Sequence, residues 1–188
     1  MLEYEKKVIL TEKEYFAIIE LMCRREPCVT QTNYYFDTDD YSMNHKGITC
    51  RIREKNRTYK TIVKNHGANY TDCSVEVELA ETTEFDPQIF NALGLRYQGK
   101  LITERIVVHK DSRCKMLLDR NTYLGHTDFE LEVEYSKGEE RSAQTVLENT
   151  ALALISYDLL NNINEFFARV GKGGSKSQRF IERLKNFK

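Results

Sequence analysis

Residue types that mark several other protein classes are scarce or missing in this chain of 188 residues. It contains two prolines, nine glycines, no tryptophan and no tract of a single residue type, which excludes collagen-like, low-complexity and disordered chains. No apolar run approaches the roughly 18 residues of a membrane-spanning helix. The opening MLEYEKKVIL lacks the layout of a signal peptide. We therefore expect a cytoplasmic protein that does not enter a membrane.

Neither sign of charge is in excess. The 28 Lys and Arg residues are balanced by 29 Asp and Glu residues, which gives a formal net charge of −1. A groove that binds nucleic acid through its phosphates needs a net positive footprint, so no such groove is expected. A small basic pocket remains compatible with this balance. Domains average about 150 residues, and we expect residues 1–188 to form a single domain.

The cysteines are odd in number and scattered. None of Cys23, Cys28, Cys50, Cys73 and Cys114 belongs to a C-x-x-C pair, and the four histidines show no ligand spacing. Disulfide frameworks and zinc sites usually show as paired or regularly spaced cysteines. We therefore expect reduced thiols with structural roles and no zinc site.

Short strands fill most of the chain, with helices at both ends and one in the middle. Strands are predicted where alternating or β-branched residues lie between turn signals: residues 2–10, 32–37, 48–55, 59–64, 73–79, 101–109, 115–119 and 129–135. Capping boxes at Thr11 and Ser175 begin the first and last helices. The first helix ends before Pro27, and the others are predicted at about 87–93, 140–170 and 177–187. This order is typical of an α+β fold.

Charged residues alternate with apolar ones along these strands, and each strand carries mainly one sign of charge. Residues two apart on a strand share a face. A sheet with one solvated face would show the same alternation, so the separation of the signs is the informative feature. The acidic sets are Glu3 and Glu5, Glu76 and Glu78, and Glu130, Glu132 and Glu134; the basic sets are Arg51 and Arg53, and Lys60 and Lys64.

Separating like charges in this way has an energetic cost. Carboxylates two apart on a strand lie about 6.5 Å from each other and, at an effective dielectric of 20, repel by roughly 2.6 kcal/mol. A divalent cation facing the acidic strands and a polyanion facing the basic strands would offset that repulsion. A sheet that closes into a barrel would bring both sets to one interior, with helices covering its apolar outer face.

Motifs along nearly the whole chain resemble those of the CYTH superfamily, the triphosphate tunnel metalloenzymes. Glu3-x-Glu5-x-Lys7 is similar to the ExExK signature of that family, and Arg51-x-Arg53 is similar to its R-x-R strand. The other matching segments follow in the family's order: Tyr35-Phe36-Asp37-Thr38, Thr61-Ile62-Val63-Lys64, Glu76-x-Glu78, Arg105, Leu118-Asp119, Asp128-Phe129-Glu130-Leu131-Glu132 and Lys176-Ser177-x-Arg179-Phe180. The chain resembles in particular the small, single-domain CYTH proteins of bacteria.

The resemblance implies a closed eight-stranded antiparallel β-barrel with helices packed outside and a tunnel with charged walls. It also implies a metal-dependent triphosphatase that uses Mg²⁺ or Mn²⁺, which prefer carboxylate oxygens, and binds phosphate through Arg and Lys. The implied metal ligands are Glu3, Glu5, Glu130 and Glu132. The implied triphosphate ligands are Arg51, Arg53, Lys64, Arg105 and Lys176. Lys7 and Glu78 are the implied catalytic residues.

Inorganic triphosphate is the expected substrate, with three alternatives. The first alternative is a class IV-type adenylate cyclase. The cyclases carry an H-F-containing segment ahead of the ExExK motif, whereas only two residues precede Glu3 here, which argues against this alternative. The second alternative is a thiamine triphosphatase. The mammalian enzyme binds its substrate on an aromatic platform that includes tryptophan, and the absence of tryptophan from this chain argues against this alternative. The third alternative is a polyphosphate- or nucleotide-binding module without turnover. The sequence does not indicate the oligomeric state. It also gives no firm role to five further charged residues: Lys60, Glu76, Asp119, Glu134 and Arg179.

Overall fold

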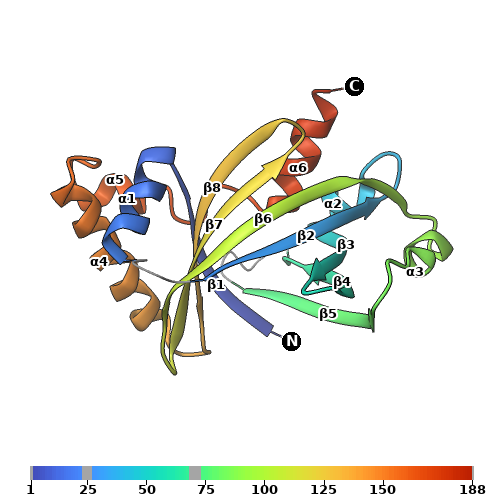
Figure 1. Cartoon of the computed structure of the whole chain (residues 1–188), viewed down its shortest axis with the longest axis horizontal. Helices are drawn as coiled ribbons and strands as arrows, with labels where there is room; N and C mark the ends of the chain where they lie inside the picture. Colours follow the sequence, from blue (N-terminus) through green and yellow to red (C-terminus); the bar gives the residue numbers. More distant parts are fainter. Residues whose placement is uncertain (1, 23–26, 68–72, 188) are drawn as a thin grey trace.

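In a computed structural model that describes residues 2–22, 27–67 and 73–187, the chain closes into a β-barrel (Figure 1). The barrel order is β1-β5-β4-β3-β2-β6-β7-β8. All neighbouring strands are antiparallel, and β1 closes the barrel by pairing with β5 and with β8. The bounds are β1 Leu2–Leu10, β2 Cys28–Asp37, β3 Ile48–Lys55, β4 Thr58–Asn65, β5 Cys73–Thr82, β6 Arg96–Lys110, β7 Cys114–Tyr123 and β8 His126–Tyr135. The expected α+β barrel of eight strands is confirmed.

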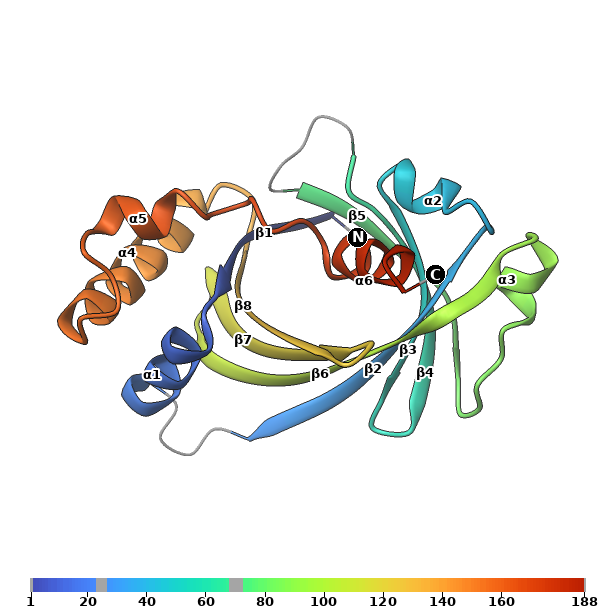
Figure 2. The same cartoon turned by 90° about the horizontal axis from the view of Figure 1, so that it is seen from above.

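Six helices accompany the barrel within these residues: α1 Glu12–Met22, α2 Ser42–His45, α3 Gln88–Ala92, α4 Glu140–Ser156, α5 Ile163–Phe167 and α6 Lys176–Lys185. Helices α1, α4 and α5 gather on one side of the barrel, and α3 lies on the opposite side (Figure 2). Helix α6 lies within the curve of the sheet. None of these six helices is both long enough and apolar enough to cross a membrane.

Helices cover much of the apolar outer face of the barrel, although Val75, Val77 and Leu79 of β5 stay partly exposed. Leu147 and Leu154 of α4 and Leu131 and Val133 of β8 are fully buried in one cluster. A smaller cluster under α3 contains Phe90, which is also fully buried. The inner face of the barrel is thereby left to the charged residues of the strands.

Helix α6 is anchored by an aromatic contact with the sheet. Phe180 packs against Tyr35 of β2, with ring centroids 5.1 Å apart, and has no exposed surface. Gly99 of β6 permits this approach, because a Cβ at that position would lie 2.7 Å from the Phe180 ring. The start of α6 is therefore held at a fixed depth in the barrel.

The helix predicted over 140–170 is wrong in one respect: α4 ends at Ser156 and α5 begins at Ile163. Asp158 adopts a left-handed conformation with φ of 55°, which ends a helix. Asn162 then caps α5 by accepting a hydrogen bond from the backbone N–H of Glu165. Helix α2 was not predicted, and all eight predicted strands are confirmed.

Candidate functional site

Charged side chains from most strands of the barrel meet in one interior cavity. Closure of the barrel turns one face of each strand inward, so residues that alternate along the strands converge. The cavity among them has a volume of about 70 Å³. Nine of the eleven predicted site residues line it: Glu3, Glu5, Lys7, Arg51, Arg53, Lys64, Arg105, Glu132 and Lys176.

Strands β1 and β8 form the acidic wall of this cavity. In their register Glu5 lies opposite Glu134 and Lys7 lies opposite Glu132. The Nζ of Lys7 lies 3.2 Å from Oε1 of Glu5. Burial opposes the charge of this lysine, but Glu5 and Glu130 raise the pKa of Lys7 above its ordinary value. Lys7 is therefore protonated at neutral pH and offsets part of the acidic wall.

Glu130 is not among the residues that line the cavity, and it has no exposed surface. Burial raises the pKa of Glu130, although Lys176 and Arg179 favour its charged form. Its Oε1 lies within ion-pair distance of Lys176 Nζ, at 3.3 Å. That geometry provides no hydrogen bond, so within the described residues this oxygen has no hydrogen-bond partner. An unsatisfied buried carboxylate oxygen is chemically suited to a cation.

Helix α6 inserts two cations among these acids. The capping box predicted from the sequence is confirmed and starts the helix at Lys176. The Nζ of Lys176 lies 2.5 Å from Oε1 of Glu132 and 3.0 Å from Oδ2 of Asp119. Arg179 pairs with Glu130. Burial opposes the charge of Lys176, but Glu130 and Glu132 raise its pKa well above the ordinary value. The C-terminal helix thus supplies countercharge to the acidic wall.

Three of the four strand cations predicted to bind substrate already have carboxylate partners. The pairs are Arg51 with Glu76 at 2.7 Å, Lys64 with Glu3 at 2.9 Å, and Arg105 with both Asp119 and Glu132 at 2.5 Å. Acids and bases on adjacent or next-but-one strands therefore neutralise one another along the cavity wall.

Arg53 departs from this pattern. Among the described residues no carboxylate forms an ion pair with it, and its Nε donates a hydrogen bond to the neutral Oδ1 of Asn33 at 3.3 Å. Burial and the neighbouring Arg51 lower the pKa of Arg53 to about 10. The charge of Glu76 acts in the opposite direction, and Arg53 remains charged at neutral pH, with no carboxylate of the described residues within ion-pair distance.

Two neutral side chains of β2 complete this wall and were not singled out from the sequence. Asn33 lies opposite Arg53, and Tyr35 lies opposite Arg51. The Nδ2 of Asn33, the hydroxyl of Tyr35 and the Nε of Arg51 are buried and have no hydrogen-bond partner among the described residues. All three atoms can donate. The alternation Gln31-x-Asn33-x-Tyr35 could have indicated them, but it carries no charge.

Glu78 is the predicted catalytic residue that the structure places outside the cavity lining. Its Oε2 lies 2.9 Å from Nζ of Lys60, and the two side chains are 43% and 42% exposed. Among the described residues the last one of β5 that pairs with β1 is Val75. Beyond that point this edge of β5 is no longer covered by β1. The position of Glu78 does not support a catalytic role, and the charge alternation alone could not show where β1 and β5 separate.

A comparison with family models matches residues 1–158 to the CYTH domain. Among curated proteins, the chain is similar to one named "Putative triphosphatase YjbK" from Bacillus subtilis (strain 168). The two are 27% identical over 155 residues, which cover 71% of this chain and 77% of that protein.

Solved structures share the fold at lower sequence identity. A Hippeastrum protein, HpAC1, described as a "putative adenylyl cyclase" with a dominant triphosphatase activity, has a TM-score of 0.65 and 18% identity. The match covers 97% of this chain and 95% of that one. The triphosphatase of a Mimivirus capping enzyme has a TM-score of 0.58 and 11% identity, over 81% of this chain and 90% of that one.

Proposed function

The chain belongs to the CYTH domain family, and on that premise we propose that it is a metal-dependent triphosphatase. It releases the terminal phosphate of a linear triphosphate inside the barrel, with inorganic triphosphate as the substrate. The names of the Bacillus subtilis and Hippeastrum relatives point to the same reaction class.

The observation that carries this proposal is the donor-rich wall of β2 and β3. Arg53 is a charged guanidinium without a carboxylate partner among the described residues, and unsatisfied donors of Asn33 and Tyr35 lie beside it. A buried donor without an acceptor costs about 1–3 kcal/mol. Phosphoryl oxygens offer several acceptors and negative charge at once, so a phosphate chain would relieve all of these groups together.

The acidic wall suits a divalent cation. Glu3, Glu5, Glu130 and Glu132 offer the oxygen ligands that Mg²⁺ and Mn²⁺ prefer, and the unsatisfied Oε1 of Glu130 is consistent with such a guest. When bound, the cation would neutralise phosphoryl oxygens and lower the pKa of a water ligand. Lys176 contacts the same carboxylates, Glu130 and Glu132. When the cation binds, the ammonium group of Lys176 would either keep its contact with these carboxylates or move away from them.

The chain's own residues position the substrate and stabilise developing charge. Arg51, Arg53, Lys64 and Arg105 would bind the phosphoryl groups, with Lys176 approaching from α6. Positioning and charge neutralisation supply most of the catalysis in phosphoryl transfer. Lys7, protonated at neutral pH, would neutralise or protonate the leaving phosphate oxygen. Glu78 has no part in this scheme, because it pairs with Lys60 outside the cavity.

A phosphate-release panel tests the proposal. Inorganic triphosphate, pyrophosphate, ATP and thiamine triphosphate would each be incubated with Mg²⁺ or Mn²⁺, and cyclic AMP would be measured in parallel with ATP. We expect the fastest release from inorganic triphosphate, with loss of activity in Glu132→Ala and in Arg53→Gln. Arg120→Gln is the matched control, because Arg120 pairs with Glu104 outside the cavity lining. Triphosphate binding without phosphate release would leave a binding module instead, and cyclic AMP formation would indicate a cyclase.

A further inference from the structure

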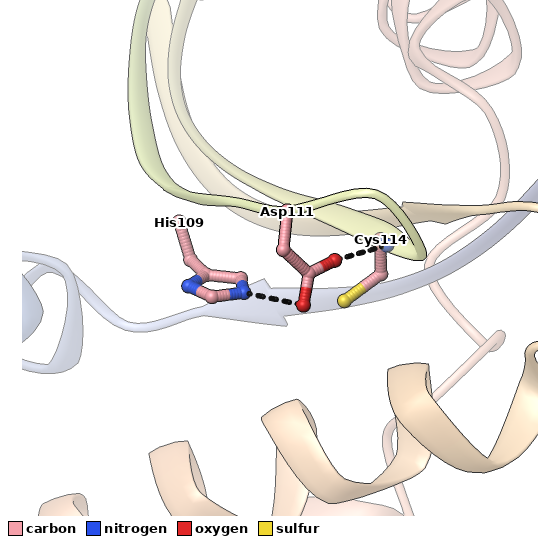
Figure 3. Close-up of side chains that lie close together, drawn as sticks. All are labelled: His109, Asp111 and Cys114. Carbon is pink, nitrogen blue, oxygen red and sulfur yellow. Dashed lines mark hydrogen bonds and ion pairs between the residues drawn. The ribbon is translucent and has the colours of Figure 1, made fainter.

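The hairpin between β6 and β7 carries a group of potential metal ligands that does not belong to the cavity. His109, Asp111 and Cys114 each offer one ligand atom, and these atoms all lie within 4.8 Å of one another (Figure 3). None of the three is among the described residues that line the barrel cavity. The group therefore needs an explanation of its own.

The turn of the hairpin holds Asp111 in a fixed orientation. One carboxylate oxygen, Oδ1, accepts hydrogen bonds from the backbone N–H groups of Arg113 and Cys114, both at 2.8 Å. These two bonds hold the pKa of Asp111 at about 2. The second oxygen, Oδ2, is directed toward Nε2 of His109 at 3.5 Å. Asp111 thus keeps an ionised oxygen available beside the imidazole.

A β-bulge brings His109 to the same side of the sheet as Cys114. The β6–β7 register shifts between Val107 and His109, so that His109 lies opposite Met116. Met116 and Cys114 are two apart on β7 and share a face. Without the extra residue, His109 would point to the other face of β6, because a shift of one residue reverses every side chain.

The mixed nitrogen, oxygen and sulfur set selects the kind of ion. Imidazole and thiolate favour borderline metals such as Zn²⁺ and Co²⁺ over Mg²⁺ or Ca²⁺, and three protein ligands leave a fourth position for water. We propose that His109, Asp111 and Cys114 form a binding site for a borderline transition-metal ion, with Zn²⁺ as the best fit. The spacing H-x-D-x-x-C contains no C-x-x-C pair, so cysteine pairing in the sequence could not reveal it.

Only modest movement is needed to complete such a site. Ligand atoms around tetrahedral Zn²⁺ lie about 3.6 Å apart. The His109 side chain is 45% exposed and can rotate, and Arg113, whose Nη2 lies 3.6 Å from Oδ2 of Asp111, is 61% exposed and can yield its contact. Cys114 is 4% exposed. It would lose its thiol proton to solvent as the thiolate binds the ion.

Titration with Co²⁺ tests the site independently of the proposed enzyme activity. A thiolate ligand gives Co²⁺ a charge-transfer absorption in the near ultraviolet, which carboxylate ligands do not produce, and the described residues lining the cavity include no cysteine. We expect one equivalent of Co²⁺ to give this absorption in the full-length protein and Zn²⁺ to displace it. Cys114→Ser should abolish the absorption, and Cys28→Ser, at an exposed thiol, should retain it.

The other two ligands provide a second comparison. Replacing a residue that hydrogen-bonds to a metal ligand lowers metal affinity by about 10–100-fold. Loss of a direct ligand in His109→Gln should therefore weaken Co²⁺ binding by about 100-fold. Asp111→Asn keeps the oxygen that accepts the two backbone hydrogen bonds of the turn and should also weaken Co²⁺ binding. Absorption that persists in Cys114→Ser, or no absorption in the wild type, would overturn the proposal.

Discussion

Arg53 and Asn33 face each other across the β3–β2 pair, and the neutral oxygen of Asn33 accepts the hydrogen bond of the charged Arg53 Nε at 3.3 Å. Elsewhere in the cavity, Arg51, Lys64 and Arg105 contact carboxylates. A buried charge that forms no ion pair is costly, so a ligand that supplies the opposite charge would be stabilised at this point of the wall.

Replacing Arg53 with methionine should separate ligand binding from stability. Arg53→Met removes a cation that forms no ion pair among the described residues but leaves the buried Oδ1 of Asn33 without its donor, so the free energy of unfolding should fall by no more than about 1–3 kcal/mol. Charge-assisted hydrogen bonds to phosphate contribute roughly 1.5–3 kcal/mol, so affinity for inorganic triphosphate should fall by about 100-fold. Calorimetric titration without metal and urea unfolding measure the two quantities. Unchanged affinity would contradict the anion site.

The two adjacent tyrosines of β2 offer a matched pair. Tyr35→Phe removes a buried hydroxyl that has no partner among the described residues, so triphosphate affinity should fall by about tenfold at little cost in stability. The hydroxyl of Tyr34 donates instead to Glu54 at 2.7 Å, and Tyr34 is not among the residues lining the cavity. Tyr34→Phe should therefore bind triphosphate as the wild type does. Equal losses in both variants would show a general effect on β2.

Lys176→Met should make the protein less stable and more responsive to divalent cations. The change leaves Asp119, Glu130 and Glu132 without one of their countercharges, and breaking a buried ion pair costs about 3 kcal/mol. Mg²⁺ or Mn²⁺ should restore more stability to Lys176→Met than it adds to the wild type. Thermal unfolding with and without metal measures this. Lys185→Met, near the C-terminal end of α6, is the control, and an equal response in both variants would argue against shared carboxylates.

The pair of Glu14 and Arg169 should make stability depend on pH. Arg169 Nη2 lies 2.6 Å from Glu14 Oε1. Burial opposes ionisation, but the hydrogen bond from Arg169 lowers the pKa of Glu14 below its ordinary value. A lowered pKa means stabilisation at neutral pH that is lost as pH falls through the folded pKa. Glu14→Gln should therefore be less stable at pH 7 by about 2 kcal/mol, and urea unfolding should show the difference shrinking toward pH 3. A constant difference would contradict the ion pair as its cause.

The alternation of charged residues predicted the barrel interior because strand geometry is local. A period of two fixes which residues share a face, whatever the partner strand, so Glu5, Arg53 and Glu132 could be assigned to one interior. The break at Asp158 could not be predicted in the same way, because residues 140–170 contain neither proline nor glycine. There the fold imposes a left-handed residue that local preference does not demand.

Features that depend on pairing between distant strands were beyond the sequence pattern. Glu78 has the spacing of a site residue, but its position depends on where β1 and β5 separate. Asn33 and Tyr35 belong to the site because they lie opposite Arg53 and Arg51, and only the β2–β3 register shows this. The contacts of Lys176 likewise depend on how deeply α6 enters the barrel.

The strand order also constrains when the molecule can assemble during synthesis. β1 precedes the other seven strands of the barrel in the chain, but its neighbours are β5 and β8, and Tyr4 pairs with Tyr135. Contacts across such long stretches of chain form slowly, because loop-closure entropy is lost before they contribute. A nascent chain that stops short of His126 exposes an unpaired edge of its first strand, and such edges add readily to other chains. The chain must therefore emerge from the ribosome to beyond Tyr135 before β1 can pair with β8 and close the barrel.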